Sequence, residues 1–516
     1  MASGLVSRWK RDSSLYTFIY TNFVVGLAFS IFSTYVLYQL QITGYFIGTD
    51  VDGLPCMTYC IVPFGSQQLD LNTVLLYMNA MTFGIGGAVT ILIIAYADFW
   101  NQKTLLVSGA IVLYGVLAIP SYWLTDPTIT NFNALFALYV VFGVVTSILI
   151  ALLNIYIPHC MRAAGHDLAA NQLDEPSKPS HAYESPKEGK ARKYGFAMTI
   201  FGMLANNISA ALILAIVAIL SGTLVGASQQ SAGLLVTTVV GFVTVVAAVG
   251  SFLGLPALSA KPWPTNSPWT TAIVGILTPF KQLLRRKNML FLLLAYTIYS
   301  DTNFALSSII SQLYFAEVHP DTLEFSLYIL ASNLFTVICT LAFYLVHRKL
   351  QFKLEKGLIL GYGLILIVPI WGCIGIADQD KFGDKHRWEF YVQALITSAS
   401  GSLVNPTFRL LYSELIPAGE EVMWFGLQIV LNCATTWVTY VATGPLQNAT
   451  HNLRFPLILC VVFLAVPPAM EILRRTLGIS KRDDLQWQDR NSHDQDNANS
   501  LGDTKFTRAS TTVEGQ

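Results

Sequence analysis

A single carboxylate stands in the middle of a long apolar segment. Asp301 is flanked by uncharged residues from 288 to 300 and from 302 to 316. An ionised Asp at such a depth costs about 2.5–3.5 kcal/mol on membrane-insertion scales, so something must compensate for it. A proton, a bound cation, the ammonium group of a substrate, or water in a cavity would each serve. The alternative is a neutral Asp that is hydrogen-bonded inside a helix bundle.

Polar side chains recur around this residue at helical spacing. Asp301 shares one face of its segment with Thr297, Ser308 and Gln312. A later segment carries a similar face, formed by Gln428, Asn432, Thr435 and Thr436. Such faces either line a pathway or hold helices together. We predict a cavity, and the candidates for binding a substrate or a proton are Asp301, Asn432, Gln428, Asn207 and Asn333.

The sequence lacks three common enzyme motifs. H-E-x-x-H, G-x-S-x-G and the phosphate-binding G-x-x-x-x-G-K-[ST] are all missing. Of the eight His, only His347 touches an apolar segment, so an intramembrane metal site is not expected. The formal net charge is zero, which gives no reason to expect a nucleic-acid partner. We therefore expect neither an enzyme nor a cofactor.

The composition indicates a polytopic membrane protein. Charged residues make up 12% of the 516 residues and the mean hydropathy is +0.52, whereas soluble domains carry about 25% charged residues. We count twelve apolar segments long enough to cross a bilayer, from Thr17–Leu40 to Phe455–Leu473. The uncharged stretch Phe196–Ala260 is divided into two of them at Ser221–Gly233. The predicted fold is all-α, with twelve transmembrane helices in two six-helix halves of the major-facilitator type.

The distribution of basic residues predicts the orientation. With both termini in the cytosol, only four of the 31 Lys and Arg lie on the opposite side. The predicted domains are a cytosolic N-terminus (1–16), a first half (17–258) with a long cytosolic loop (159–195), a linker (259–288), a second half (289–473) and a mostly disordered cytosolic tail (474–516). On the non-cytosolic side, Cys56 and Cys60 either pair or stay as free thiols, and Asn448 is a glycosylation sequon.

Several segments resemble the autophagy-related protein 22 family of fungal vacuolar effluxers. They are Leu75–Leu106, LLNIYIPHC (Leu152–Cys160), LLAYTIYSDTNFAL (Leu293–Leu306) and, most specifically, LYSELIPAGEEVMWFGL (Leu411–Leu427). The resemblance implies a transporter in the vacuole membrane that returns amino acids such as Leu, Ile and Tyr to the cytosol. Asp98, Asp301 and Glu414 fall on motif positions, and we assign Asp98, Glu414 and Arg409 to gating. The chain departs from the family after Asp98, where Lys103 is the first basic residue.

Three hypotheses follow from the sequence. The first is an amino-acid effluxer that works by alternating access and is coupled to protons. The second is an exporter of another small metabolite or of a drug. The third, from a different class, is a non-transporting receptor or scaffold that acts through its cytosolic loop and tail.

Overall fold

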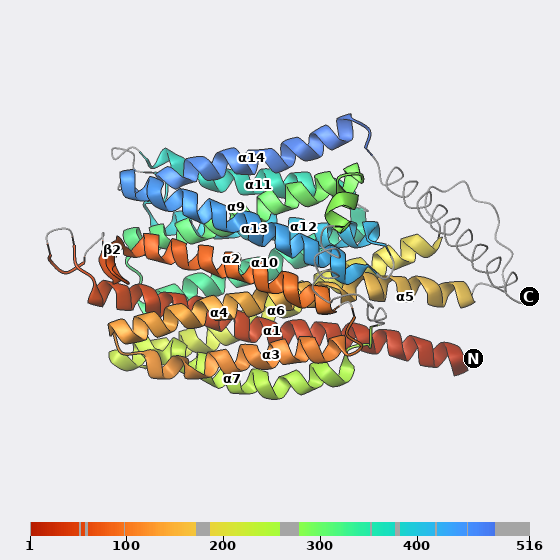
Figure 1. The fold of residues 1–516 in the computed structure, drawn as a ribbon, viewed down its shortest axis with the longest axis horizontal. Helices are drawn as coiled ribbons and strands as arrows, with labels where there is room; N and C mark the ends of the chain where they lie inside the picture. Colours follow the sequence, from red (N-terminus) through yellow and green to blue (C-terminus); the bar gives the residue numbers. More distant parts are fainter. Residues whose placement is uncertain are drawn as a thin grey trace, which may run out of the picture.

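The protein is a bundle of long helices. The computed structural model describes residues 2–479 apart from 51–52, 57–59, 98, 172–185, 259–277, 351–352, 377–381, 418–419 and 451. Figure 1 shows that α1 begins and α14 ends at the same end of the bundle, which we call the basal end. The opposite end carries a two-stranded antiparallel hairpin and is called the hairpin end.

The first half runs from α1 to α7. Its helices are α1 (Ala2–Ile47), α2 (Leu71–Ala97), α3 (Lys103–Ala118), α4 (Ile129–Asn154), α5 (Tyr156–Asn171), α6 (Pro186–Thr223) and α7 (Ala227–Gly254). The 3₁₀ helix η1 (Ile119–Leu124) extends α3. Strands β1 (Ile61–Phe64) and β2 (Gln67–Asp70) pair between α1 and α2, with Ile61 opposite Asp70.

The second half contains six helices among the described residues. They are α9 (Lys287–Val318), α10 (Thr322–Leu350), α11 (Leu354–Ile374), α12 (Arg387–Leu415), α13 (Glu421–Thr450) and α14 (Phe455–Thr476). Each of the twelve predicted membrane segments therefore coincides with a helix. The short helix α5, which follows α4 at the basal end, was not expected.

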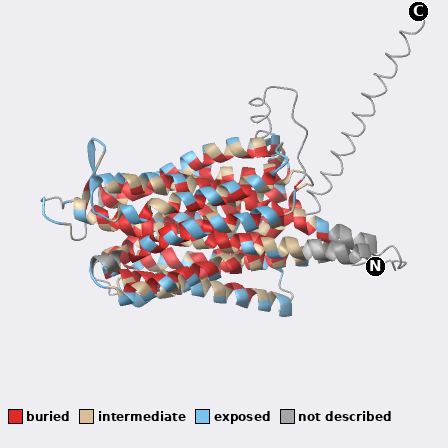
Figure 2. Ribbon diagram, turned by 90° about the horizontal axis from the view of Figure 1, so that it is seen from below, coloured by how far each residue is buried: buried red, intermediate tan, exposed pale blue. Residues whose placement is uncertain are grey.

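Lipid explains why the segments are helical and apolar all round. A bilayer offers the backbone no hydrogen-bond partner, so each crossing segment must satisfy its own peptide groups. Large apolar side chains remain exposed on the outer faces of the bundle, including Val246 at 73% and Leu253 at 76%, and Figure 2 shows the buried residues gathered inside. Eleven helices among the described residues are long and apolar enough to cross a membrane. The twelfth, α12, is long enough but carries many polar residues.

Helices from the two halves meet along two seams. Helix α2 packs against α13, and α6 packs against α10 and α12. Gly87 in α2 lies so close to α13 that a Cβ atom at this position would be 2.7 Å from the Cβ of Cys433. Gly426 in α13 is similarly close to Ile94. Small residues therefore let the two halves approach each other along the α2–α13 seam.

Candidate functional site

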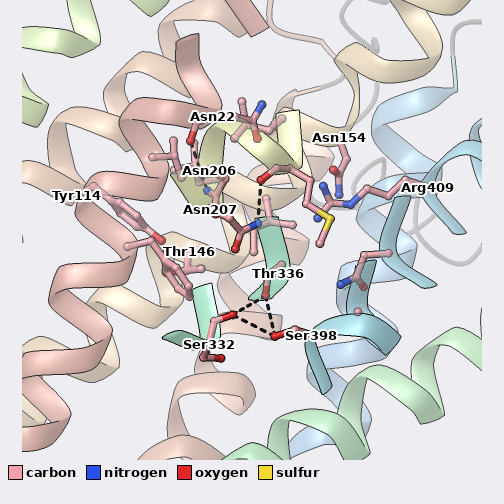
Figure 3. Close-up of a pocket in the computed structure, with 18 of the residues that line it drawn as sticks. Asn22, Tyr114, Thr146, Asn154, Asn206, Asn207, Ser332, Thr336, Ser398 and Arg409 are labelled. Atoms are coloured by element: carbon pink, nitrogen blue, oxygen red, sulfur yellow. Dashed lines mark hydrogen bonds between the residues drawn. The ribbon is translucent and has the colours of Figure 1, made fainter. Parts of the chain in front are cut away.

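A cavity of about 350 Å³ lies between the two halves. Residues of α1, α3, α4 and α6 line it on one side, and residues of α10 and α12 on the other (Figure 3). Its apolar wall is formed by Val25, Phe29, Leu149, Ile150, Leu153 and Met203. Five asparagines contribute amide groups: Asn22, Asn154, Asn206, Asn207 and Asn405.

Hydroxyl groups connect the two second-half helices at the cavity. The Thr336 hydroxyl lies 3.0 Å from both the Ser332 carbonyl and the Ser398 hydroxyl, and the Ser398 hydroxyl donates to the Ser332 carbonyl at 3.1 Å. Figure 3 shows this triangle at the edge of the cavity. Because these bonds hold α10 to α12, the second half presents one continuous polar wall.

The first-half amides use their N–H groups internally. The Asn22 side chain donates to the Phe18 carbonyl at 2.8 Å, and the Asn207 side chain donates to the Met203 carbonyl at 2.8 Å. The Asn206 side chain reaches the Asn22 carbonyl at 3.4 Å. The side-chain oxygens of these three amides accept no hydrogen bond among the described residues. They are thus available to a donor inside the cavity.

Arg409 supplies the cavity's charge. Its side chain reaches from α12 towards Asn154 of α4 (Figure 3). Among the described residues that line the cavity there is no carboxylate and no other cation. The lining is therefore positively charged, with its charge at the basal side.

Asp301 lies elsewhere, in a buried cluster between α9 and α13. It is 4% exposed and accepts hydrogen bonds from the hydroxyls of Thr435 and Thr436, the latter at 2.5 Å. Beside it, the Asn432 amide donates to the Ser300 hydroxyl at 3.2 Å. Asp301 is not among the residues that line the cavity. Two neighbouring hydroxyls thus provide compensation for its depth.

Two ion pairs join the halves at the basal end. Arg162 of α5 pairs with Glu421 of α13 and also donates to the carbonyls of Ile416 and Pro417, at 2.7 and 3.2 Å. Arg192 of α6 lies 3.0 Å from Glu414 of α12. We call these two pairs the basal latch. Arg162 and Arg192 come from α5 and α6 and not from the loop between α2 and α3. The basal latch therefore does not use basic residues of the loop that contains Asp98.

Hydroxyls and aromatic rings join the halves at the hairpin end. Tyr35 of α1 is 2.6 Å from the Ser326 hydroxyl of α10, and Tyr38 is 3.0 Å from that of Thr322. The Tyr38 ring stacks on Phe325 with 4.7 Å between centroids. Hydrogen bonds and ring contacts between α1 and α10 thus hold the two halves together at the hairpin end, and none of these contacts is an ion pair.

A buried acidic residue lies in the loop before α12. Asp384 is fully buried, accepts a hydrogen bond from the Gln393 amide and is near Arg454, which pairs with Glu317 at 2.6 Å. Burial is the main cause that raises the Asp384 pKa to about 7, and Glu389 adds to the effect. The loop thus holds a carboxyl group that changes charge near neutral pH.

The remaining predicted residues fall in different places. Asn207 and Arg409 line the cavity, whereas Gln428 and Asn432 are buried on α13 and Asn333 bonds within its own helix at 2.9 Å. Glu414 lies in the basal latch. Cys56 and Cys60 form a disulfide. Asp98 and the side chain of Asn448 lie outside the residues that the structure describes.

Sequence reasoning missed most of the cavity. Asn22, Asn154, Ser332, Thr336, Ser398 and Asn405 line it but were not proposed. A signal was present in α12, because Ser398, Gly401, Asn405 and Arg409 are spaced by three or four residues and share one face. Among the described residues, no group of three or more His, Cys, Asp or Glu is arranged to hold a metal ion.

Comparisons with known proteins match nearly the whole chain. The family model described as "Vacuole effluxer Atg22 like" matches residues 12–475. Autophagy-related protein 22 of Candida albicans is 26% identical over 475 residues, which cover 87% of this chain and 86% of that protein. Autophagy-related protein 22 of Saccharomyces cerevisiae is 25% identical over 186 residues, or 35% of this chain and 34% of that protein.

Solved structures with the same fold are transporters. The major facilitator superfamily transporter FucP in its outward conformation superposes with a TM-score of 0.54 at 13% identity, covering 89% of this chain and 98% of that one. The xylose transporter XylE of E. coli gives a TM-score of 0.53 at 12% identity, with 89% and 98% covered. At this identity the likeness shows the fold, which is that of a major facilitator.

Proposed function

Because this chain belongs to the Atg22-like vacuole effluxer family, we propose that it returns small neutral amino acids, such as Leu, Ile and Tyr, from the vacuole to the cytosol. The carrier works by alternating access, in which the two halves rock around a site between them. The observation that carries this proposal is the cavity bounded by helices of both halves. A substrate held there contacts both moving parts.

The size and lining of the cavity suit one amino acid. Its volume of about 350 Å³ is at the lower end of the roughly 300–1,000 Å³ range of small-molecule sites. The apolar wall fits an apolar side chain, and the amide and hydroxyl groups can pair with the polar backbone end of the substrate. A large hydrophobic drug would leave these polar groups without partners, which is costly.

The proposed orientation places the basal end in the cytosol. Basic residues concentrate there, as the positive-inside rule requires. The hairpin end then faces the vacuolar lumen, and the disulfide Cys56–Cys60 lies on that non-cytosolic side. Transport from vacuole to cytosol therefore runs from the hairpin end to the basal end.

Asp301 provides a means of coupling to protons. The hydroxyls of Thr435 and Thr436 each have one proton and two acceptors within reach. One acceptor is Asp301, and the other is a carbonyl of α13 itself, that of Leu431 at 2.8 Å or of Asn432 at 2.6 Å. An ionised Asp301 keeps both hydroxyls turned towards α9. Protonation releases them to α13, the helix that packs on α2 across the seam.

Exchange of labelled leucine by purified protein in liposomes tests the proposal. We expect internal unlabelled leucine to drive uptake, and an acidic hairpin side to stimulate net flux. The Asp301→Asn protein should still exchange leucine, but its net flux should no longer depend on pH, because the Asn amide does not titrate. Failure of wild-type protein to exchange leucine, isoleucine or tyrosine would refute the substrate assignment.

A further inference from the structure

Arg409 lies at the basal side of the cavity. It is half-buried, and its guanidinium makes no ion pair or hydrogen bond among the described residues. Six other arginines among the described residues each lie within 4 Å of a carboxylate oxygen: Arg162, Arg192, Arg387, Arg454, Arg474 and Arg475. A charge inside the membrane is costly unless it meets a partner or water. Arg409 therefore retains its full capacity to bind an anion.

We propose that Arg409 binds the carboxylate of the transported molecule and that this carboxylate, and not the ammonium group, is the feature the site requires. The inference rests on the proposed function and narrows its substrate class. A guanidinium offers two parallel N–H groups that match the two oxygens of a carboxylate. The Asn154 amide, towards which Arg409 reaches across the cavity, is placed to join this contact (Figure 3).

The rest of the lining explains why the ammonium group is secondary. No carboxylate lines the described part of the cavity, so an ammonium group meets only neutral oxygens, such as those of Asn22, Asn206 and Asn207. Neutral acceptors bind a cation less strongly than an ionised one does. A substrate without the ammonium group loses little, whereas a substrate without the carboxylate leaves Arg409 unpaired.

Two consequences for selectivity follow. The α-keto acid of leucine, 4-methyl-2-oxopentanoate, keeps the carboxylate and the aliphatic side chain, so it should bind. Lysine and arginine bring a second positive charge into a lining that is already positive, so they should be rejected. Leucinol, which has the ammonium group but a hydroxyl in place of the carboxylate, should also fail to bind.

Thermal unfolding of the purified full chain in detergent tests the inference with these four kinds of probe. For wild-type protein we expect leucine and 4-methyl-2-oxopentanoate to raise Tm with increasing concentration, and leucinol and lysine to leave it unchanged. Arg409→Gln should raise the half-maximal ligand concentration about 10- to 100-fold, as expected for losing a hydrogen bond to a charged group. For Arg409→Lys, which keeps the positive charge but not the two parallel N–H groups, the half-maximal ligand concentration should lie between those of the wild type and Arg409→Gln. The matched control Arg348→Gln removes an exposed arginine of α10 and should change nothing.

The outcomes separate this inference from the proposed function. If leucinol stabilises the wild type as well as leucine does, or if Arg409→Gln binds leucine unchanged, the inference is refuted while leucine transport stands. If the keto acid stabilises the wild type but not Arg409→Gln, and leucine is neither bound nor exchanged, the role of Arg409 is supported and the amino-acid assignment is refuted. If neither carboxylate ligand stabilises the wild type, the inference fails, and this result requires no variant to fold.

Discussion

The basal latch should control how often the two halves separate at their basal end. We propose to remove its basic partners with the double substitution Arg162→Gln and Arg192→Gln. An exposed ion pair contributes about 0.2–1 kcal/mol, and breaking a fully buried one costs about 3–5 kcal/mol. The side chains of Arg162 and Glu421 are 28% and 13% exposed, and those of Arg192 and Glu414 are 33% and 9% exposed. Both pairs are partly exposed, so the contribution of each pair to the free energy should lie between that of an exposed pair and that of a buried pair.

The structure therefore sets the size of the expected effect. We expect the loss of Arg162, which also donates to two backbone carbonyls, to destabilise the joined state by about 2 kcal/mol. The loss of Arg192 should destabilise it by about 1 kcal/mol. A total of about 3 kcal/mol changes the ratio of separated to joined states about a hundredfold in favour of separation.

Distances between two spin labels report this change. Leu253 at the basal end of α7 and Leu350 at the basal end of α10 are 76% and 67% exposed and can carry the labels in a background without the five free cysteines. The double variant should show a longer distance that is rare in the wild type. The control Lys353→Gln with Lys356→Gln removes two exposed charges from the same end and should resemble the wild type. The charge exchange Arg162→Glu with Glu421→Arg should keep the short distance of the wild type, because the two exchanged side chains can still form an ion pair.

An unchanged distance distribution in the double variant would refute the latch. It would mean that apolar packing alone holds the basal end together. A longer distance in the Lys353→Gln/Lys356→Gln control as well would also refute it, because net charge and not specific pairing would then be the cause.

Two further predictions concern stability. Gly87→Leu should lower Tm, because a side chain there meets Cys433 across the α2–α13 seam at a cost of about 1–3 kcal/mol. Gly84→Leu on the same helix should not lower Tm, because a Cβ atom there has no other atom within 4 Å. Equal Tm values for the two variants would show that the seam is loosely packed. Burial raises the pKa of Asp384 from 3.8 to about 7, so between these values the folded protein binds more protons than the unfolded chain. Tm should therefore fall as the pH is raised from 5 to 8, and the fall should be smaller in Asp384→Asn; a slope that this substitution does not alter would exclude Asp384 as its source.

The sequence predicted those features that the bilayer itself imposes. Every crossing helix must be long and apolar, so all twelve segments could be recognised, including the turn that separates α6 from α7. The depth of Asp301 showed that it needs compensation, but many groups can provide this. Thr435 and Thr436 were recognised as polar, yet only the packing of α9 on α13 brings them to Asp301.

Most residues of the cavity lining could not be predicted, because they come from six different helices. Which asparagines face the gap depends on the rotation of each helix within the bundle, and the mean hydropathy of a segment carries no information about that rotation. From the sequence we assigned Arg409 to gating. The structure places it in the cavity, since α12 exposes one polar face to the gap between the halves. That same polar face makes α12 the least membrane-like of the twelve helices.

Filling the cavity tests the central claim, that substrate binds between the halves, most directly. Gly401 lines the cavity, and a Cβ atom there would meet only the Asn405 amide nitrogen at 3.6 Å. Gly401→Leu thus puts a side chain into the space while improving helix propensity. Gly363→Leu makes the same change on an exposed face of α11, with no atom within 4 Å. We predict that leucine exchange is lost in Gly401→Leu, with Tm no lower than that of the wild type, and is retained in Gly363→Leu. Exchange at the wild-type rate by a folded Gly401→Leu protein would contradict the account.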